Sequence, residues 1–101
     1  MAYEVRVTRS AAVGLEDAVA YIAEVLAESS AAAALLADFD RLTDDFALCP
    51  EMFMLCGDPN LSRQGIRKAL VGGYISLYVI DGGTVTIIGF FHQSQDYAKL
   101  V

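Results

Sequence analysis

Residues 65–97, which read GIRKALVGGYISLYVIDGGTVTIIGFFHQSQDY, contain the pattern that decides the fold. Three apolar runs rich in Ile, Val, Tyr and Phe are separated by Gly-Gly and by Asp-Gly-Gly, and such glycine pairs are typical of tight reversals between strands. We therefore predict strands over residues 66–71, 74–80 and 84–91, paired as a three-stranded antiparallel meander. The last strand carries a polar cluster to one end of the sheet, which is the first place to look for a site. The cluster consists of His92, Gln93, Gln95, Asp96 and Tyr97.

One strand and two helices are predicted before the meander. Residues 3–8 alternate between apolar and polar side chains, as a half-buried strand does. Residues 10–28 repeat apolar side chains at helical spacing, and so does a second segment that follows Ser29 and Ser30 and ends before Pro50. The short junction between the two helices implies an antiparallel hairpin. The apolar stripes consist of Leu15, Ala18 and Ile22 in the first helix and Leu35, Phe39, Leu42 and Phe46 in the second.

Local sequence also predicts how the helices begin. Thr8 or Ser10 is expected to cap the first helix by accepting a free backbone N–H, and Ser29 or Ser30 to cap the second. Gly14 is expected to weaken the first helix slightly. The resulting order β-α-α-β-β-β predicts an α+β domain in which an antiparallel sheet packs against an α-helical hairpin. The first strand can add to either edge of the meander.

Residues 51–64 lack a clear period and contain Gly57, Pro59 and Asn60, which indicates a surface loop. The residues at 52–55 are all apolar. We expect these side chains to pack against the core. An exposed patch for a partner is the alternative.

Size and composition indicate one small domain. The chain has 101 residues, of which 55% are hydrophobic, so it can bury a core of its own. No apolar run is long enough to span a membrane and the first residues do not resemble a signal peptide, so we expect a cytoplasmic protein with no membrane partner. Cys49 and Cys56 are close enough for a disulfide, although reduced thiols are the expectation in the cytosol. Two cysteines and one histidine are too few for a zinc site, and we expect no cofactor.

Charge is distributed unevenly along the chain, whose net charge is −6. Residues 10–51 hold nine acidic side chains and one basic side chain, Arg41, which gives −8; the remainder holds six basic and four acidic side chains, which gives +2. The helical half is therefore expected to face solvent or a basic segment of a partner. A symmetric homodimer through this half is disfavoured by repulsion between like charges.

His92 is the single histidine and the first candidate for chemistry. Its imidazole can exchange a proton near neutral pH, and Tyr97 can stack on a base or donate a hydrogen bond. Arg67 and Lys68 lie on a predicted strand of the same sheet, where cationic side chains can hold a phosphate. Together these four side chains would form a phosphodiester site.

A simpler, structural interpretation explains the same residues. In it, Asp96 caps a last helical turn, Tyr97 and Leu100 pack on the sheet, and His92 hydrogen-bonds to Asp96. The spacing alone favours this interpretation, because a lone histidine is a weak signal. The chain also lacks a phosphate-binding glycine loop, a Gly-x-Ser-x-Gly elbow and a Cys-x-x-Cys pair.

Three motifs give the chain a resemblance to a known family. They are Gly-Ile-Arg-Lys at 65–68, the pair Tyr74 and Tyr78, and Phe-His-Gln-Ser-Gln-Asp-Tyr at 91–97. Together with the order of elements, they resemble the RelE/ParE superfamily, the small toxins of type II toxin–antitoxin modules. The resemblance implies one toxin domain over residues 1–101. It also implies a cognate antitoxin that wraps an extended or helical segment over the toxin.

The resemblance implies one of two activities. RelE-like members cleave messenger RNA in the ribosomal A site, whereas ParE-like members bind and poison DNA gyrase and are not enzymes. Whether this chain is an enzyme is left open by the resemblance. In the nuclease hypothesis, His92 and Tyr97 match positions that are catalytic in some members, and Arg67 matches a recurring arginine that is catalytic or structural. Lys68, Gln93 and Gln95 would then contact phosphate or RNA.

The sequence departs from the nuclease pattern at three positions. Ile75, Gln93 and Gln95 stand where nuclease members often carry arginines that stabilise the charge on the scissile phosphate. The acidic net charge is also unusual for a protein that binds the ribosome. Three hypotheses follow: a ribosome-dependent endoribonuclease, a toxin that binds gyrase, and a degenerate member that only binds its antitoxin.

Overall fold

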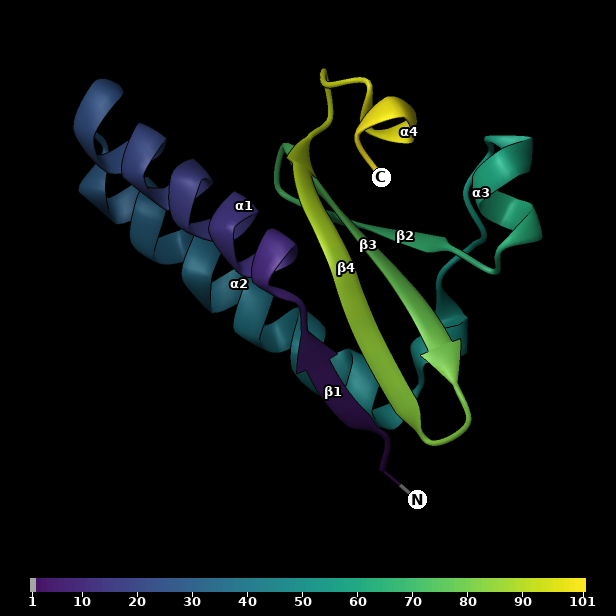
Figure 1. Ribbon diagram of the computed structural model, residues 1–101. Helices are drawn as coiled ribbons and strands as arrows, with labels where there is room; N and C mark the ends of the chain where they lie inside the picture. Colours follow the sequence, from purple (N-terminus) through teal and green to yellow (C-terminus); the bar gives the residue numbers. More distant parts are fainter. Residues whose placement is uncertain (1) are drawn as a thin grey trace.

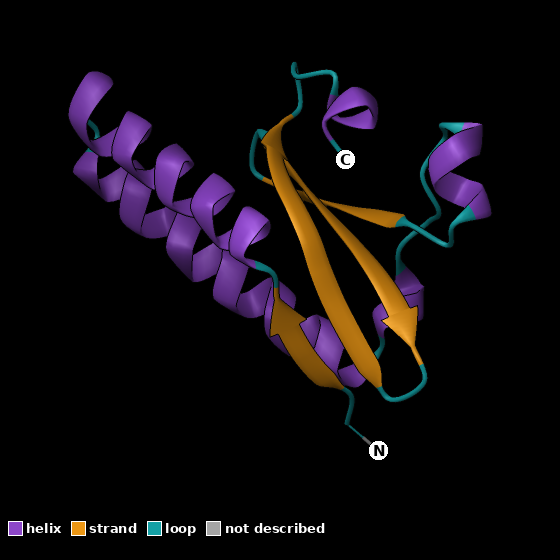
Figure 2. Cartoon of the chain, in the orientation of Figure 1, coloured by secondary structure: helices purple, strands orange, loops and turns teal. Residues whose placement is uncertain are grey.

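A four-stranded sheet forms the centre of the protein in a computed structural model that describes residues 2–101 (Figure 1). The strands lie in the spatial order β1-β4-β3-β2. Two long helices lie side by side across one face of the sheet, and their N- to C-terminal directions are opposite (Figure 2). The predicted α+β architecture is therefore confirmed. The strands are β1 (Glu4–Val7), β2 (Arg67–Val71), β3 (Tyr74–Asp81) and β4 (Thr84–His92), and the helices are α1 (Arg9–Ala20) and α2 (Ser29–Leu48).

The meander forms where the glycine pairs predict it. Gly72 and Gly82 each have a φ of 59°, a left-handed conformation that glycine adopts at little cost and that two-residue hairpin turns require. Within β4, Gly89 is opposite Leu77 and Ile87 is opposite Tyr78, so Ile88 is the extra residue of a β-bulge. Because of the bulge, odd-numbered side chains of β4 face the helices before Ile88 and even-numbered side chains face them after it.

β1 pairs with β4 in parallel, with Val5 opposite Val85 and Val7 opposite Ile87. The sheet is therefore mixed, and the prediction of a wholly antiparallel sheet is wrong for this strand. The reason lies in the connection, because the backbone N–H of Thr8 donates to the Ile87 carbonyl at 3.0 Å and α1 then packs along β4. This arrangement selects one of the two edges that the sequence left open.

The start of α1 is confirmed and its end is not. The Thr8 Oγ1 atom accepts from the Ala11 N–H at 3.2 Å, which is the predicted cap. After Ala20 the chain forms a π-helix, η1 (Tyr21–Val25), instead of continuing as an α-helix to residue 28. The π-helix therefore replaces the α-helical structure that was predicted for residues 21–25.

The reversal between η1 and α2 depends on backbone conformation. Ala27 has a φ of 54° and turns the chain, and Glu28 occupies the position before α2 without a side-chain capping bond. The prediction that Ser29 or Ser30 caps α2 is therefore wrong, because both residues already lie inside the helix.

Residues 49–66 contain more structure than the predicted loop. Two short helices lie within them, η2 (Pro50–Met52) and α3 (Pro59–Arg63), and Asp58 caps α3 through its side chain. Only Phe53 of the apolar stretch at 52–55 packs against the core. The expectation of core packing is wrong for Met52, Met54 and Leu55, which are exposed.

The sheet is buried on both faces. Toward α1 and α2, Tyr78 is completely buried beside Phe46, and its hydroxyl donates to the Pro50 carbonyl at 2.6 Å. Burial raises the pKa of Tyr78 to about 12. The opposite face packs beneath residues 56–66 and the C-terminal turn, α4 (Tyr97–Leu100). The buried residues of that second cluster are Cys56, Leu61, Ile66, Ile75 and Leu77.

Candidate functional site

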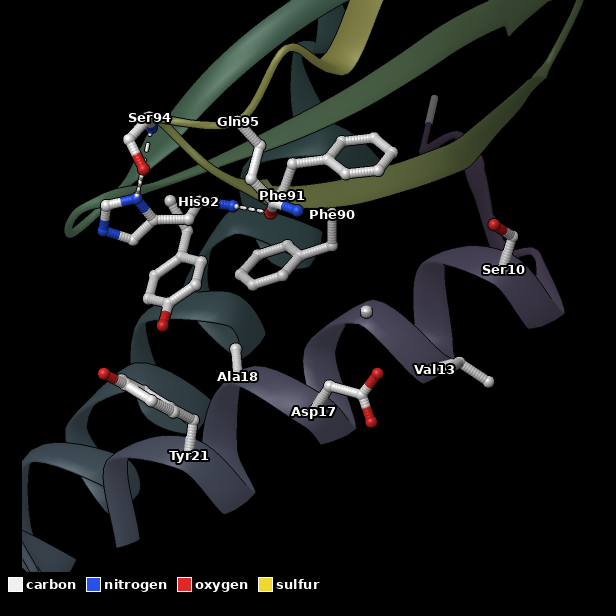
Figure 3. A pocket seen from close by; sticks show the side chains of 12 residues that line it. Ser10, Val13, Asp17, Ala18, Tyr21, Phe90, Phe91, His92, Ser94 and Gln95 are labelled. Atoms are coloured by element: carbon white, nitrogen blue, oxygen red, sulfur yellow. Dashed lines mark hydrogen bonds between the residues drawn. The ribbon is translucent and has the colours of Figure 1, made fainter. Parts of the chain in front are cut away.

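A groove of about 730 Å³ separates α1 from the end of β4 that carries His92 (Figure 3). Asp17 lines the groove from α1 and Tyr21 from η1, and Phe90 and His92 line it from the sheet. Gly14 sets how closely the two walls approach, because a Cβ atom at that position would lie 2.4 Å from the Phe90 carbonyl oxygen. The predicted polar end of the sheet is thus one wall of a groove.

The bulge at Ile88 decides which side chains enter this groove. Before the bulge, Val85 and Ile87 face the helices; after it, the even-numbered Phe90 and His92 do so, opposite Ser76 and Tyr74. An unbroken strand would have turned His92 away from α1.

The imidazole of His92 is held by its own loop. Its Nδ1 atom lies 2.6 Å from the Ser94 hydroxyl and accepts from the Ser94 backbone N–H at 3.1 Å. A backbone N–H only donates, so Nδ1 is the acceptor and Nε2 carries the proton of the neutral ring. The His92 backbone N–H donates to Gln95 Oε1 at 2.8 Å. The predicted hydrogen bond between His92 and Asp96 is not formed, and the Nδ1 atom is hydrogen-bonded to Ser94 instead.

Aromatic rings form the floor of the groove. Tyr74 stacks on Phe90 with ring centroids 5.3 Å apart, and it meets His92 edge to face at 5.2 Å. These three side chains come from the neighbouring strands β3 and β4. Tyr21 lies across the groove on η1 and is half exposed. The groove therefore offers apolar and aromatic surface with a polar rim.

The groove carries a negative charge. Asp17 is the one charged side chain among the described residues that line it, apart from any charge on His92 itself. Asp17 projects from α1 and lines the groove (Figure 3). A carboxylate without a neighbouring cation repels a phosphate, so this groove is electrostatically suited to a cationic or neutral ligand.

Arg67 lies at the end of β2 that is farther from His92. It is opposite Tyr78 on β2, whereas His92 is opposite Tyr74, four residues or about 13 Å further along the sheet. Its guanidinium donates to the Phe53 carbonyl at 2.6 Å. In this structure Arg67 tethers residues 50–56 to β2.

Lys68 is on the opposite face of the sheet from Arg67, because neighbouring residues of a strand alternate in side. It is opposite Leu77 in the second cluster, near the buried Cys56, whose thiol pKa is raised by burial and lowered to a smaller extent by the Lys68 charge. Arg67 and Lys68 therefore do not converge on one ligand. Cys49 is exposed and Cys56 is buried, and both are free thiols.

Tyr97 and the two glutamines also separate. Tyr97 stacks on Phe91 at 6.5 Å, in the cluster on the face away from the helices. Packing of Tyr97 on the sheet is thus confirmed, while Leu100 is 58% exposed and Asp96 makes no side-chain cap, so those parts of the structural interpretation are wrong. Gln93 is exposed, and Gln95 lines the groove with its amide oxygen bonded to the backbone of His92.

A family model decides the affiliation of the chain. The model described as the ParE toxin of type II toxin–antitoxin system, parDE, matches residues 5–97. This chain belongs to the ParE toxin family. The RelE/ParE resemblance seen in the sequence is thereby confirmed, and the protein is a toxin of the type II toxin–antitoxin class. No curated protein sequence gives a significant match.

Two solved structures share the fold of this ParE-family chain. One is described as the chromosomal ParDE TA system from P. aeruginosa, with a TM-score of 0.70 and 15% identity over 89% of this chain and 95% of that chain. The other is described as the toxin–antitoxin complex RelBE2 from Mycobacterium tuberculosis, with a TM-score of 0.57 and 22% identity over 92% of this chain and 100% of that chain. At these identities the likeness concerns the fold alone.

Sequence reasoning missed the wall of the groove that α1 and the start of η1 form in this ParE-family toxin. Val13, Asp17 and Tyr21 recur every fourth residue and line the groove together, off the apolar stripe. That spacing, next to a helical glycine, was the available signal. Within residues 2–101, no group of three or more His, Cys, Asp or Glu side chains is arranged to hold a metal. None of the helices in that range combines the length and apolar character that crossing a membrane requires.

Proposed function

We propose that this ParE-family toxin acts by binding a protein target and does not cleave RNA. The charge of the groove beside His92 carries the proposal. RNA cleavage needs positive charge where the scissile phosphate sits, and this groove holds Asp17 and no lysine or arginine among its described lining residues. A phosphodiester bound in this groove would share it with the Asp17 carboxylate.

The positions of the other candidate catalytic residues support the same proposal. Arg67 lies about 13 Å from His92 along the strand direction, and its guanidinium is bonded to the Phe53 carbonyl. Tyr97 packs with Phe91 on the face of the sheet that is turned away from α1 and α2. General acid–base catalysis requires groups within hydrogen-bond reach of one substrate. His92, Arg67 and Tyr97 are too dispersed to share one.

The proposal includes two partners. The two solved structures named above are described as toxin–antitoxin systems, and we propose that a cognate antitoxin likewise neutralises this chain. For the target we propose DNA gyrase in the cytoplasm, because the family match is to ParE and the resemblance to ParE-like members implies that enzyme.

Supercoiling by purified gyrase tests the target. The toxin is expected to inhibit supercoiling at stoichiometric concentrations and to leave messenger RNA intact in a translating extract. His92→Ala is the informative variant, since loss of a catalytic acid or base lowers a rate by roughly 10²- to 10⁴-fold. We expect His92→Ala to change growth arrest and gyrase inhibition by less than about twofold, because a binding toxin needs no proton transfer.

Cleavage of messenger RNA that disappears in His92→Ala would contradict the proposal and support the nuclease hypothesis. Asp17→Asn serves as the matched control, because it changes the charge of the same groove without removing the imidazole. Absence of both cleavage and gyrase inhibition, with antitoxin binding retained, would support the hypothesis of a degenerate member.

A further inference from the structure

The groove beside His92 contains a carboxylate that no cation of the chain neutralises. Asp17 is exposed, and among residues 2–101 no basic side chain lies within ion-pair distance of it. The described residues that line the groove include no lysine or arginine. The carboxylate is therefore available to a positively charged group of a partner, and complementary charge favours such a partner over an anionic one.

Aromatic side chains surround this carboxylate. Tyr21 is half exposed and follows Asp17 by four residues, so both side chains project from the helical wall of the groove (Figure 3). Tyr74 lines the opposite wall, where its stacking on Phe90 fixes the orientation of its ring. A cation that pairs with a carboxylate and also lies on an aromatic ring gains from both contacts.

Arginine matches this arrangement better than lysine does. A guanidinium is planar and carries five N–H donors and no acceptor, so its edge can donate to Asp17 while its plane rests on Tyr21. An ammonium is a compact and strongly hydrated charge that stacks less well. The groove volume of about 730 Å³ is in the range of pockets that enclose a whole small ligand, so the end of an arginine side chain fits inside.

His92 contributes little to such a contact, although it lines the same groove. Its Nδ1 atom already accepts from the Ser94 N–H, and its Nε2 atom carries the proton of the neutral ring. The imidazole therefore has no acceptor to offer a guanidinium. This agrees with the small effect expected for His92→Ala on gyrase inhibition.

We propose that the groove beside His92 receives an arginine side chain of the protein target. The guanidinium would pair with Asp17 and stack on Tyr21, and Tyr74 would bound the site from the sheet. One carboxylate among aromatic rings selects a single cation, not a run of basic residues. The inference rests on the proposed function in one respect: the target, and not the antitoxin, supplies the arginine.

Titration of the free toxin with N-acetyl-arginine amide tests the chemistry of the groove without assuming a target. Backbone amide signals are followed by two-dimensional NMR. We expect saturable shifts at Asp17 and Tyr21, with a dissociation constant of roughly 1–10 mM. N-acetyl-citrulline amide has nearly the same shape without the charge, and we expect it to bind at least about tenfold more weakly. Equal responses to the two probes would overturn the proposal.

Affinity for purified gyrase tests the source of the arginine. Asp17→Asn is expected to weaken binding by roughly tenfold or more, because a hydrogen bond between charged groups is lost. Glu16→Gln is the matched control, since it removes an exposed carboxylate at the adjacent position of α1, outside the groove; its effect should stay below about twofold. Tyr21→Leu should weaken binding roughly two- to fivefold, whereas Tyr21→Phe retains the ring and should bind like the wild type.

The affinity of each variant for the antitoxin is measured in parallel. We expect it to change by less than about twofold, which also shows that the variant is folded. If Asp17→Asn weakens antitoxin binding as much as gyrase binding, the arginine does not come from the target alone and the proposal is overturned.

The remaining outcomes separate this site from the proposed function. Wild-type inhibition of gyrase with equal affinities of Asp17→Asn and Glu16→Gln would overturn the arginine site and leave the proposed target intact. A wild-type chain that ignores gyrase but binds the arginine probe in the groove would overturn the proposed target and support the chemistry of the site.

Discussion

At the scale of single residues, Ser76 is the clearest departure from a satisfied core. It is completely buried in the middle of β3, between Ala69 on one side and Phe90 on the other, and its hydroxyl has no hydrogen-bond partner among residues 2–101. An unsatisfied buried hydroxyl costs roughly 1–3 kcal/mol. We expect Ser76→Ala to raise the free energy of unfolding by about 1 kcal/mol, since the lost volume is small. Urea unfolding monitored by circular dichroism measures it.

Ser62→Ala is the control for this prediction, because the Ser62 hydroxyl already donates to the Pro59 carbonyl at 3.3 Å near the surface. We expect that substitution to change stability by less than about 0.5 kcal/mol. If Ser76→Ala instead destabilises the chain, the Ser76 hydroxyl has a partner, such as a buried water, that stabilises the fold.

The sequence predicted individual site residues only in part, and the bulge at Ile88 is the reason. Alternation along residues 84–91 gives the order of side chains but not the register shift, which depends on how β3 and β4 pair. The polar cluster was therefore placed at the correct end of the sheet, while which of His92 and Tyr97 faces α1 was not predictable. Nothing in the sequence shows that α1 faces β4, so a groove lined by Asp17 was not predictable.

At the scale of elements, the contact between α1 and β4 depends on Gly14. Alanine has the higher helix propensity, by about 1 kcal/mol, so propensity alone predicts that Gly14→Ala stabilises the chain. The structure predicts the opposite, because the added Cβ would lie 2.4 Å from the Phe90 carbonyl oxygen and would push α1 off the sheet. We expect a net loss of roughly 1–3 kcal/mol, the usual cost of overpacking. Thermal unfolding of the purified chain measures this loss.

Ala20→Gly is the comparison variant for this contact, because Ala20 is exposed near the end of α1 and reports helix propensity alone. A Gly14→Ala protein as stable as the wild type would mean that α1 can shift away from β4 without loss.

Elements were predicted better than their ends. The periods of 2 and 3.6 located every long helix and strand, because burial of one face imposes these patterns. The ends depended on local backbone conformations instead. Ala27, at a φ of 54°, and the π-helix at Tyr21–Val25 belong to a junction whose geometry is set by how η1 and α2 pack. No side-chain pattern encodes that packing in a run dominated by alanine.

At the scale of the whole molecule, the uneven charge has two consequences of opposite sign. Nine acidic side chains and one basic side chain between residues 10 and 51 repel one another in the free toxin. The same charges attract a basic segment of a partner such as the proposed antitoxin. Screening by salt must therefore stabilise the free chain and weaken its complex, since the screening length falls from about 30 Å at 0.01 M to about 10 Å at 0.1 M.

We expect the melting temperature of the free toxin to rise by roughly 2–5 °C between 0.02 and 0.3 M NaCl, equivalent to under about 1 kcal/mol for a chain of this size. Over the same range the dissociation constant of the antitoxin complex is expected to increase. Asp40→Asn/Asp44→Asn removes a like-charged pair one helical turn apart on α2, so it should reduce the salt dependence of the melting temperature. A complex that tightens with salt would mean that apolar contact dominates the interface and that the acidic side chains of residues 10–51 do not attract the partner.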